Sequence, residues 1–179
     1  MSILLAKAAS DALLTWLKTA LPAQITALNG QSPVAYGGAD GSAQVPITLD
    51  AIRAWTDHAL VAQAPTPVVY VLPQSTALRT PNQTAELDQA HEFLVCFEVG
   101  DPDQGIAHAK CLYYVAAFVR AVVSYLAGQS AGPAGCTLLL GHEGNEQLVQ
   151  WGVTPDTTTP AGLYEFAKVA VTAFSSELP

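Results

Sequence analysis

The feature that most constrains the fold is the segment 106–127, which is apolar on more than one face of a helix. Its apolar residues recur at three- and four-residue spacing, and Gly128 follows as a C-terminal signal. One stripe holds Val115, Val119, Val122 and Leu126, and an adjacent stripe holds Ala107, Cys111, Tyr114, Phe118, Ala121 and Tyr125. Because a helix of this kind needs more than one neighbour, we predict a surface built for assembly.

Three other segments have the pattern of strands. Residues 67–73 form an apolar run bounded by prolines, as in a strand whose ends cannot extend the hydrogen-bonded ladder. In residues 92–99, every second residue from Phe93 to Val99 is apolar, which is the period of a strand with one buried side. Glu92 and Glu98 mark the other face, which the apolar Leu94 and Cys96 make only partly wet. Residues 163–174 form a long β-prone segment, which we expect in the centre of the sheet. Between the last two segments, residues 101–105 predict an acidic turn that leads into the long helix.

The remaining elements are predicted from helix and turn signals. Residues 2–21 have amphipathic spacing and stop at Pro22, which predicts an N-terminal helix. The Gly-rich stretch 29–48 predicts a projecting loop or a hairpin. A short helix is expected to begin at Thr48 or Asp50 and to run to Ala62. Residues 74–88 are polar and predict a loop. The whole chain, 1–179, is therefore expected to form a single α+β domain in which a mostly antiparallel sheet packs on helices.

The composition narrows the classes of function. Half of the 179 residues are hydrophobic, and 12% are charged. The formal net charge of −8 disfavours sequence-specific DNA binding, because that mode of binding neutralises phosphates with Lys and Arg. Few charges and many apolar residues suggest apolar surface that another copy or another protein covers.

Neither the cysteines nor the N-terminus indicates an extracellular or membrane protein. Three cysteines, Cys96, Cys111 and Cys136, are an odd count without a close pair, so reduced thiols are expected rather than a disulfide framework or a zinc site. Charged residues interrupt the apolar N-terminus, which argues against a signal peptide. The apolar segment 111–127 is short for a membrane span and contains Arg120, so a buried or interfacial helix is expected.

We find no convincing catalytic constellation, cofactor motif or metal motif. Asp101, Asp103 and His108 lie close in sequence but match no calcium-binding loop, so a capped turn and a surface histidine are favoured. Cys111 with His108 lacks an orienting third group, and buried cysteines are usually inert. His91 is expected to be a solvated residue at a strand edge. The aromatic line Tyr114, Phe118 and Tyr125 favours a core or a subunit interface over a small-molecule pocket. No enzymatic activity and no cofactor are predicted.

In the order of its predicted elements and in their residue patterns, the chain resembles the tail terminator (tail completion, or neck) proteins of long-tailed bacteriophages. The resemblance covers most of the chain and rests on a helical start, a strand "VVYVLP", a strand and acidic turn "FLVCFEVGDPDQ", a long helix and a closing strand "LYEFAKVAVTAF". It implies a virion protein, assembled in the host cytoplasm, that forms a ring, commonly a hexamer, at the head-proximal end of the tail. Such a ring stops growth of the tail tube and offers a docking face to the head.

The resemblance also implies partners and site residues. The partners are further copies of the chain, the tail tube protein and the head–neck connector protein, with DNA only in passage and no membrane. Tyr114, Phe118 and Tyr125 are the expected subunit interface. Glu98, Asp101 and Asp103 are the candidates for lining the channel, where like charge would keep DNA from sticking. The competing interpretation of these acids is solvated turn residues that cap the next helix.

Two other hypotheses stay open at this stage. The first is a small dimeric α+β subunit, an enzyme or a ligand-binding protein, with a pocket under the line from Tyr114 to Tyr125. The second is another neck or tube component of the same virus particle. The native mass separates a ring from a dimer, and imaging of the assembled particle separates the two kinds of virion component.

Overall fold

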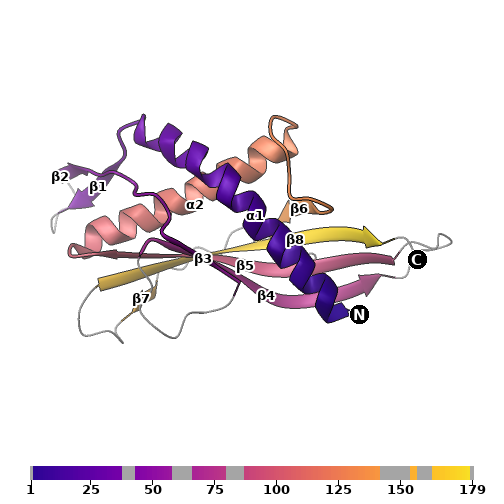
Figure 1. Cartoon of the computed structure of the whole chain (residues 1–179). Helices are drawn as coiled ribbons and strands as arrows, with labels where there is room; N and C mark the ends of the chain where they lie inside the picture. The colour runs from indigo at the N-terminus through magenta and orange to yellow at the C-terminus, as the bar shows by residue number, and fades with distance from the viewer. Residues whose placement is uncertain are drawn as a thin grey trace.

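The computed structural model describes residues 2–37, 43–57, 66–79, 87–141, 154–156 and 163–177. Two long helices, α1 (Ser2–Asn29) and α2 (Gln104–Leu126), lie on the same face of a sheet (Figure 1). The strands are β1 (Val34–Gly37), β2 (Ala43–Pro46), β3 (Ala54–Thr56), β4 (Val68–Arg79), β5 (Leu87–Asp101), β6 (Thr137–Leu140), β7 (Thr154–Asp156) and β8 (Leu163–Glu177). The predicted class, a mostly antiparallel sheet packed on helices, is confirmed.

The main sheet has the strand order β3-β4-β5-β8-β6, and β7 also pairs with β8. β3 runs parallel to β4, whereas every other pair in this sheet is antiparallel. β8 therefore lies inside the sheet, as its β-prone sequence predicts, and pairs with β5 along its whole length. Among the described strands, β3 and β6 form opposite edges of the sheet.

The core lies between the sheet and the two helices. The alternating residues of β5 meet the expectation, because Phe93, Val95, Phe97 and Val99 are all buried on the helix side. The opposite face is apolar as well, with a second buried cluster of Val68, Tyr70 and Cys96. Both faces of the sheet are thus removed from water in its central strands.

Helix α2 buries most of both predicted stripes within its own chain. It contacts β5 and β8 on one side and α1 on the other. Tyr114 and Phe118 are fully buried, and their rings pack against Phe97 at centroid distances of 6.3 and 6.2 Å. The prediction that these two residues form a subunit interface is therefore wrong. The second neighbour that the helix requires is α1, because a long amphipathic partner in the same chain covers the extra face.

The N-terminal helix does not stop at Pro22. It continues to Asn29 with Pro22 inside it, although an internal proline removes one backbone hydrogen bond and costs about 3 kcal/mol in a helix. Pro22 lies on the exposed side, whereas the following apolar residues Ile25 and Leu28 are buried in the core. Packing of this last stretch offsets the cost, and the Thr26 hydroxyl donates to the Pro22 carbonyl at 2.9 Å.

The short helix predicted from Asp50 is wrong for residues 50–56, and residues 58–62 lie outside the described ones. This segment is extended and ends in β3. Its backbone polar groups bond to distant partners: the Asn29 side chain binds both the N–H and the carbonyl of Leu49, at 2.8 and 3.0 Å. Tyr114 donates to the Asp50 carbonyl at 2.7 Å, and the Arg53 N–H donates to the Pro67 carbonyl at 2.8 Å. These tertiary bonds replace the local bonds of a helix.

The Gly-rich stretch contains an antiparallel hairpin of β1 and β2, one of the two predicted alternatives, with residues 38–42 outside the described part. The loop predicted for residues 74–88 is wrong for residues 74–79 and 87–88, and residues 80–86 lie outside the described part. β4 runs to Arg79 and β5 begins at Leu87, so the flanking polar residues form strands. Cross-strand polar pairs stabilise this extension: Ser75 donates to Glu92 at 2.6 Å, and Thr76 lies 3.1 Å from His91.

His91 is fully buried, so the prediction of a solvated histidine is wrong. Its Nδ1 lies 3.1 Å from the Thr76 hydroxyl and its Nε2 lies 3.1 Å from the Ser175 hydroxyl. Burial lowers the pKa of His91 from the ordinary value of 6.5, because desolvation disfavours the charged imidazole. Two hydroxyl partners allow a neutral ring to be satisfied at both nitrogens.

This lowered pKa predicts a loss of stability in mild acid. Since the unfolded chain takes up the proton first, the free energy of unfolding falls as the pH drops below 6.5, and it stops falling below the folded-state pKa. The slope between these two pKa values is about 1.4 kcal/mol per pH unit. Urea midpoints of the natural protein and of His91→Gln, measured between pH 5 and 8, check this. Parallel curves for the two proteins would rule it out.

Candidate functional site

The residues singled out for chemistry do not come together. Asp103 caps α2, accepting from the Ile106 N–H at 3.1 Å, and Asp101 accepts from Lys110 Nζ at 3.0 Å. The third candidate ligand, His108, lies beside Glu165 instead. Within the described residues, no group of three or more His, Cys, Asp or Glu side chains is arranged to hold a metal ion.

The three candidate channel acids differ in their surroundings. Glu98 forms a hydrogen bond with the Tyr70 hydroxyl, on the sheet face away from the helices. The Asp101 side chain is 16% exposed and forms an ion pair with Lys110. Asp103 is exposed, and its carboxylate satisfies the helix terminus. Glu98 and Asp101 are thus engaged within the chain, whereas Asp103 combines the capping role with exposure.

The thiols are poor nucleophiles. Cys111 is fully buried, and its Sγ donates to the Glu165 carbonyl at 3.1 Å. Burial and the nearby Glu165 carboxyl raise the pKa of Cys111 well above its usual range, and burial raises the pKa of Cys96 to about 11. Because the thiolate is the reactive form, neither group is activated near neutral pH.

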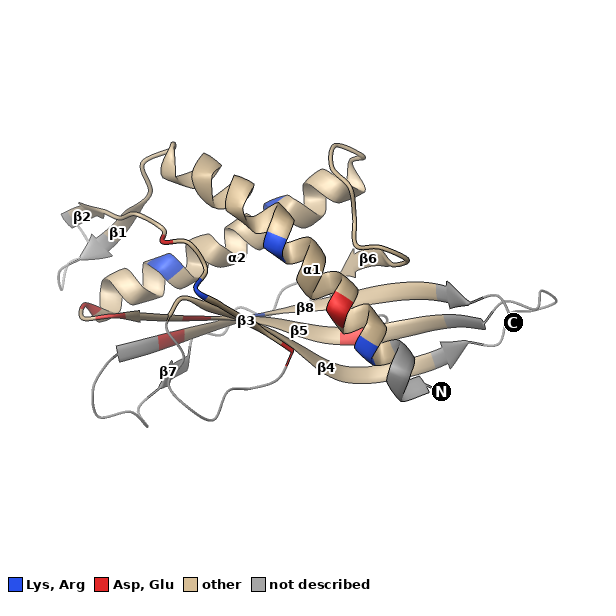
Figure 2. Cartoon of the chain, in the orientation of Figure 1, with Lys and Arg blue, Asp and Glu red and all other residues tan. Residues whose placement is uncertain are grey.

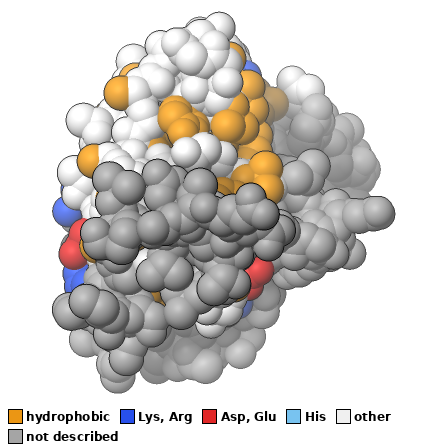
Figure 3. All heavy atoms as spheres, turned by 90° about the vertical axis from the view of Figure 1, so that its right-hand side faces the viewer, with side chains coloured by type: hydrophobic (Ala, Val, Ile, Leu, Met, Phe, Trp, Pro, Cys, Tyr) orange, Lys and Arg blue, Asp and Glu red, His pale blue; other side chains and the backbone are white. Residues whose placement is uncertain are grey.

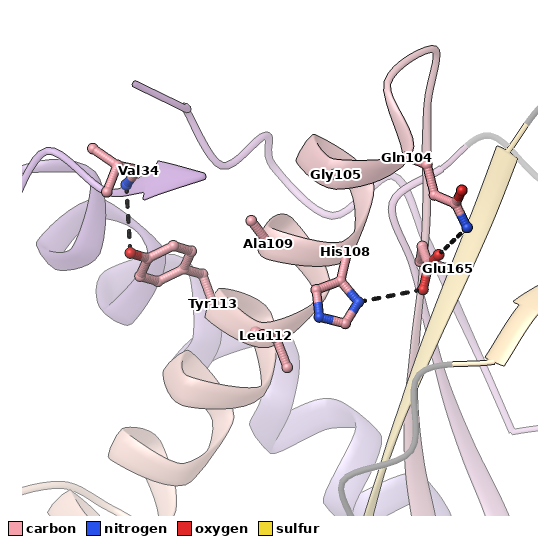
Figure 4. Close-up of a pocket in the computed structure, with 8 residues that line it drawn as sticks. All are labelled: Val34, Gln104, Gly105, His108, Ala109, Leu112, Tyr113 and Glu165. Atoms are coloured by element: carbon pink, nitrogen blue, oxygen red, sulfur yellow. Dashed lines mark hydrogen bonds and ion pairs between the residues drawn. The ribbon is translucent and has the colours of Figure 1, made fainter. Parts of the chain in front are cut away.

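A groove of about 600 Å³ lies between the first turns of α2, the start of β8 and β1. Its lining is apolar along one wall and polar at one end, with the residues Val34, Gln104, Gly105, His108, Ala109, Leu112, Tyr113 and Glu165 (Figure 4). The Glu165 side chain is 3% exposed, and its Oε1 accepts from Gln104 Nε2 at 3.1 Å. His108 Nδ1 lies 3.6 Å from Oε2, and the histidine side chain is half exposed. The groove therefore ends at a buried carboxyl group.

Glu165 was missed by reasoning from the sequence, although a signal is present. It occupies the inward register of β8, opposite Val99 and in phase with the buried Ala167 and Val169. An acid at an inward position of an otherwise apolar strand breaks the binary pattern, and such breaks are expected at functional sites.

A second surface feature is the apolar end of α2. Val123 and Leu126 are 52% and 53% exposed, and both lie in the last turns of the helix. Figure 3 views this end of the molecule and shows hydrophobic side chains gathered on it. Charges are sparse along both layers of the protein (Figure 2). On the edge strand β6, Leu139 is 42% exposed, but it alternates with Leu138 of the helix-side core and therefore lies on the other face of the sheet.

Tyr125, the third predicted interface residue, is half-buried. Its ring packs edge-on against Trp16 at a centroid distance of 6.2 Å, and Trp16 Nε1 donates to the Ala131 carbonyl at 2.7 Å. The ring also lies so close to Gly132 that a Cβ there would be 2.2 Å from Tyr125 Cε2. Tyr125 thus anchors the loop after α2, and the outward residues of this region are Val123 and Leu126.

By length and composition, α2 could cross a membrane, but half of its most apolar window is buried within the protein, as in a core helix. No protein-family model matches the chain, and no curated protein matches its sequence.

Proposed function

We propose that the protein is a tail terminator of a long-tailed bacteriophage, a structural protein of the virion. In this role it forms a ring, most simply a hexamer, at the head-proximal end of the tail. The ring caps the tail tube protein and offers a docking face to the head–neck connector protein. Its work is done by interfaces, without making or breaking a covalent bond.

The proposal rests on the side of the molecule where β6 forms the edge of the sheet, because this side has an open strand edge and exposed apolar side chains. Among the described residues no strand pairs with the outer edge of β6, and Val123 and Leu126 leave apolar area in water at the end of α2. Open edges and exposed apolar groups together favour association with another chain. A contact between this side and the opposite side of the next copy is heterologous, and such contacts repeat until rotation closes a ring.

The charge of the chain supports passage of DNA without tight binding. A net charge of −8 per copy is multiplied in a ring and repels phosphates. Asp103 is the acid that we assign to the channel surface, because it is exposed. Glu98 and Asp101 contribute to the same field while paired within the chain.

The groove at Glu165 favours a second candidate function, a small dimeric ligand-binding or enzyme subunit. A cleft that is largely apolar and has a few polar groups at one end is a common form of ligand site. The predicted pocket under the line from Tyr114 to Tyr125 is not the basis of this alternative, since Tyr114 packs directly on Phe97. A dimer that carries a bound small molecule through purification would support it.

Addition of the purified protein to polymerising tail tube protein tests the proposal. We expect tubes to stop growing, with a ring at one end in electron micrographs, because a capped end no longer exposes the surface that the next tube subunit needs. A matched control is the protein unfolded and left in the same buffer. Tubes of unchanged length, without a ring at either end, would contradict the tail terminator assignment.

A further inference from the structure

The Glu165 carboxyl group lacks one hydrogen-bond partner. Its Oε1 is bound by Gln104, whereas its buried Oε2 has no hydrogen bond to any described residue. His108 Nδ1 lies 3.6 Å from Oε2 (Figure 4). A buried acceptor without a donor costs free energy, so a donor delivered through the groove would be bound with a net gain.

The shape and lining of the groove indicate the kind of donor. Its wall is formed by Val34, Ala109, Leu112 and the Tyr113 ring, and its end by the carboxyl group. A long side chain with an apolar stem and a cationic tip matches both parts. Arginine fits best, because its planar guanidinium offers several donors at once and tolerates burial beside a carboxylate.

Most cations of the described chain have partners already. Lys7 is paired with Asp11 and Asp57, Lys110 with Asp50 and Asp101, and Arg120 donates to Gln31. Three exposed cations have side chains that form no hydrogen bond or ion pair with other described residues: Lys18, Arg53 and Lys168. Arg53 is the arginine among them.

Arg53 lies across the sheet from Glu165. It immediately precedes β3, the edge strand of the sheet, whereas Glu165 is on β8, three strands away in the strand order. Neighbouring strands are about 4.8 Å apart, which places the two residues beyond reach within one copy. A head-to-tail contact between copies brings the β3 side of one chain to the β8 side of the next.

We propose that the groove between α2 and β8 is the acceptor for Arg53 of a neighbouring copy, with the guanidinium completing the hydrogen bonds of Glu165. This contact rests on the proposed ring, and it specifies which two sides of the subunit meet. Gln104 holds the carboxyl group in position from the same copy, through its bond to Oε1.

The test is a double-mutant cycle on assembly. Glu165→Gln and Arg53→Gln each remove the charge with little change in shape, and Lys18→Gln is a matched control on an exposed helix position. We expect each of the first two variants to raise the protein concentration at half-assembly by about tenfold or more, because each leaves a charged partner buried and unpaired. The double variant should need no higher a concentration for half-assembly than the single variant that assembles less well. The Lys18→Gln control should assemble at the same concentration as the natural chain. Native mass spectrometry over a concentration series gives these midpoints.

Arg53 is exposed, so Arg53→Gln keeps its fold even if Glu165→Gln does not. The contact would be overturned, with the ring left intact, if Arg53→Gln did not change the concentration at half-assembly. It would also be overturned if the effects of the two single variants simply added in the double variant. A natural chain that stays monomeric, also with tail tube protein present, would overturn the ring and the contact together.

Discussion

Replacing both Val123 and Leu126 with aspartate is expected to abolish ring formation and to leave the folded protomer intact. Both side chains are about half exposed at the end of α2, so the protomer tolerates charge there. Burial of a large aliphatic side chain contributes about 1.5–3 kcal/mol, and a buried unpaired carboxylate adds a further cost. Loss of two such contacts weakens association about a hundredfold or more, since each 1.4 kcal/mol is tenfold.

Circular dichroism and native mass spectrometry of the double aspartate variant measure both parts of this expectation. Val123→Ile with Leu126→Met is the matched control, because it keeps the surface apolar. The control should assemble like the natural chain. If the aspartate variant forms rings at the same concentration as the control, the end of α2 is not an interface.

Phe118→Ala is expected to destabilise the protomer itself by about 3–5 kcal/mol, the usual cost of truncating a buried aromatic side chain. Phe118 is fully buried and packs against Phe97 at a centroid distance of 6.2 Å, so the truncation leaves a cavity in the core. The loss should be seen in denaturant unfolding of dilute, unassembled protein.

Val123→Ala is the comparison for this measurement, because it truncates a side chain on the same helix that is 52% exposed. Its effect on the unfolding free energy should stay within about 0.5 kcal/mol, as for most surface positions. A Phe118→Ala protomer that unfolds like the natural one, but no longer assembles, would restore Phe118 to the subunit interface.

The contrast between these two positions shows what periodicity can and cannot predict. The two stripes of α2 are visible in the sequence, and both become buried for most of their length. Periodicity reports that a helix face is apolar, but not whether the neighbour belongs to the same chain. Here the neighbour is α1 of the same chain. This helix is longer than predicted, because packing of the residues beyond Pro22 outweighs the local cost of the proline.

Long-range hydrogen bonds account for most of the other differences. Asn29 and Tyr114 hold the backbone at Leu49 and Asp50 from distant elements, and local propensity contains no information on these partners. Asp103 shows the converse case, since its capping bond is local and its role follows from the sequence. The groove could not be predicted because it joins α2 to β8 and to β1, three segments far apart in the chain.

The central claim is that copies of this chain cover one another's exposed apolar side. The most direct test is the native mass of the purified protein over a range of concentrations, alone and with tail tube protein. The account predicts a single closed ring with a mass that is a whole multiple of 18.7 kDa, most simply six copies. A protein that stays at 18.7 kDa under every one of these conditions would contradict it.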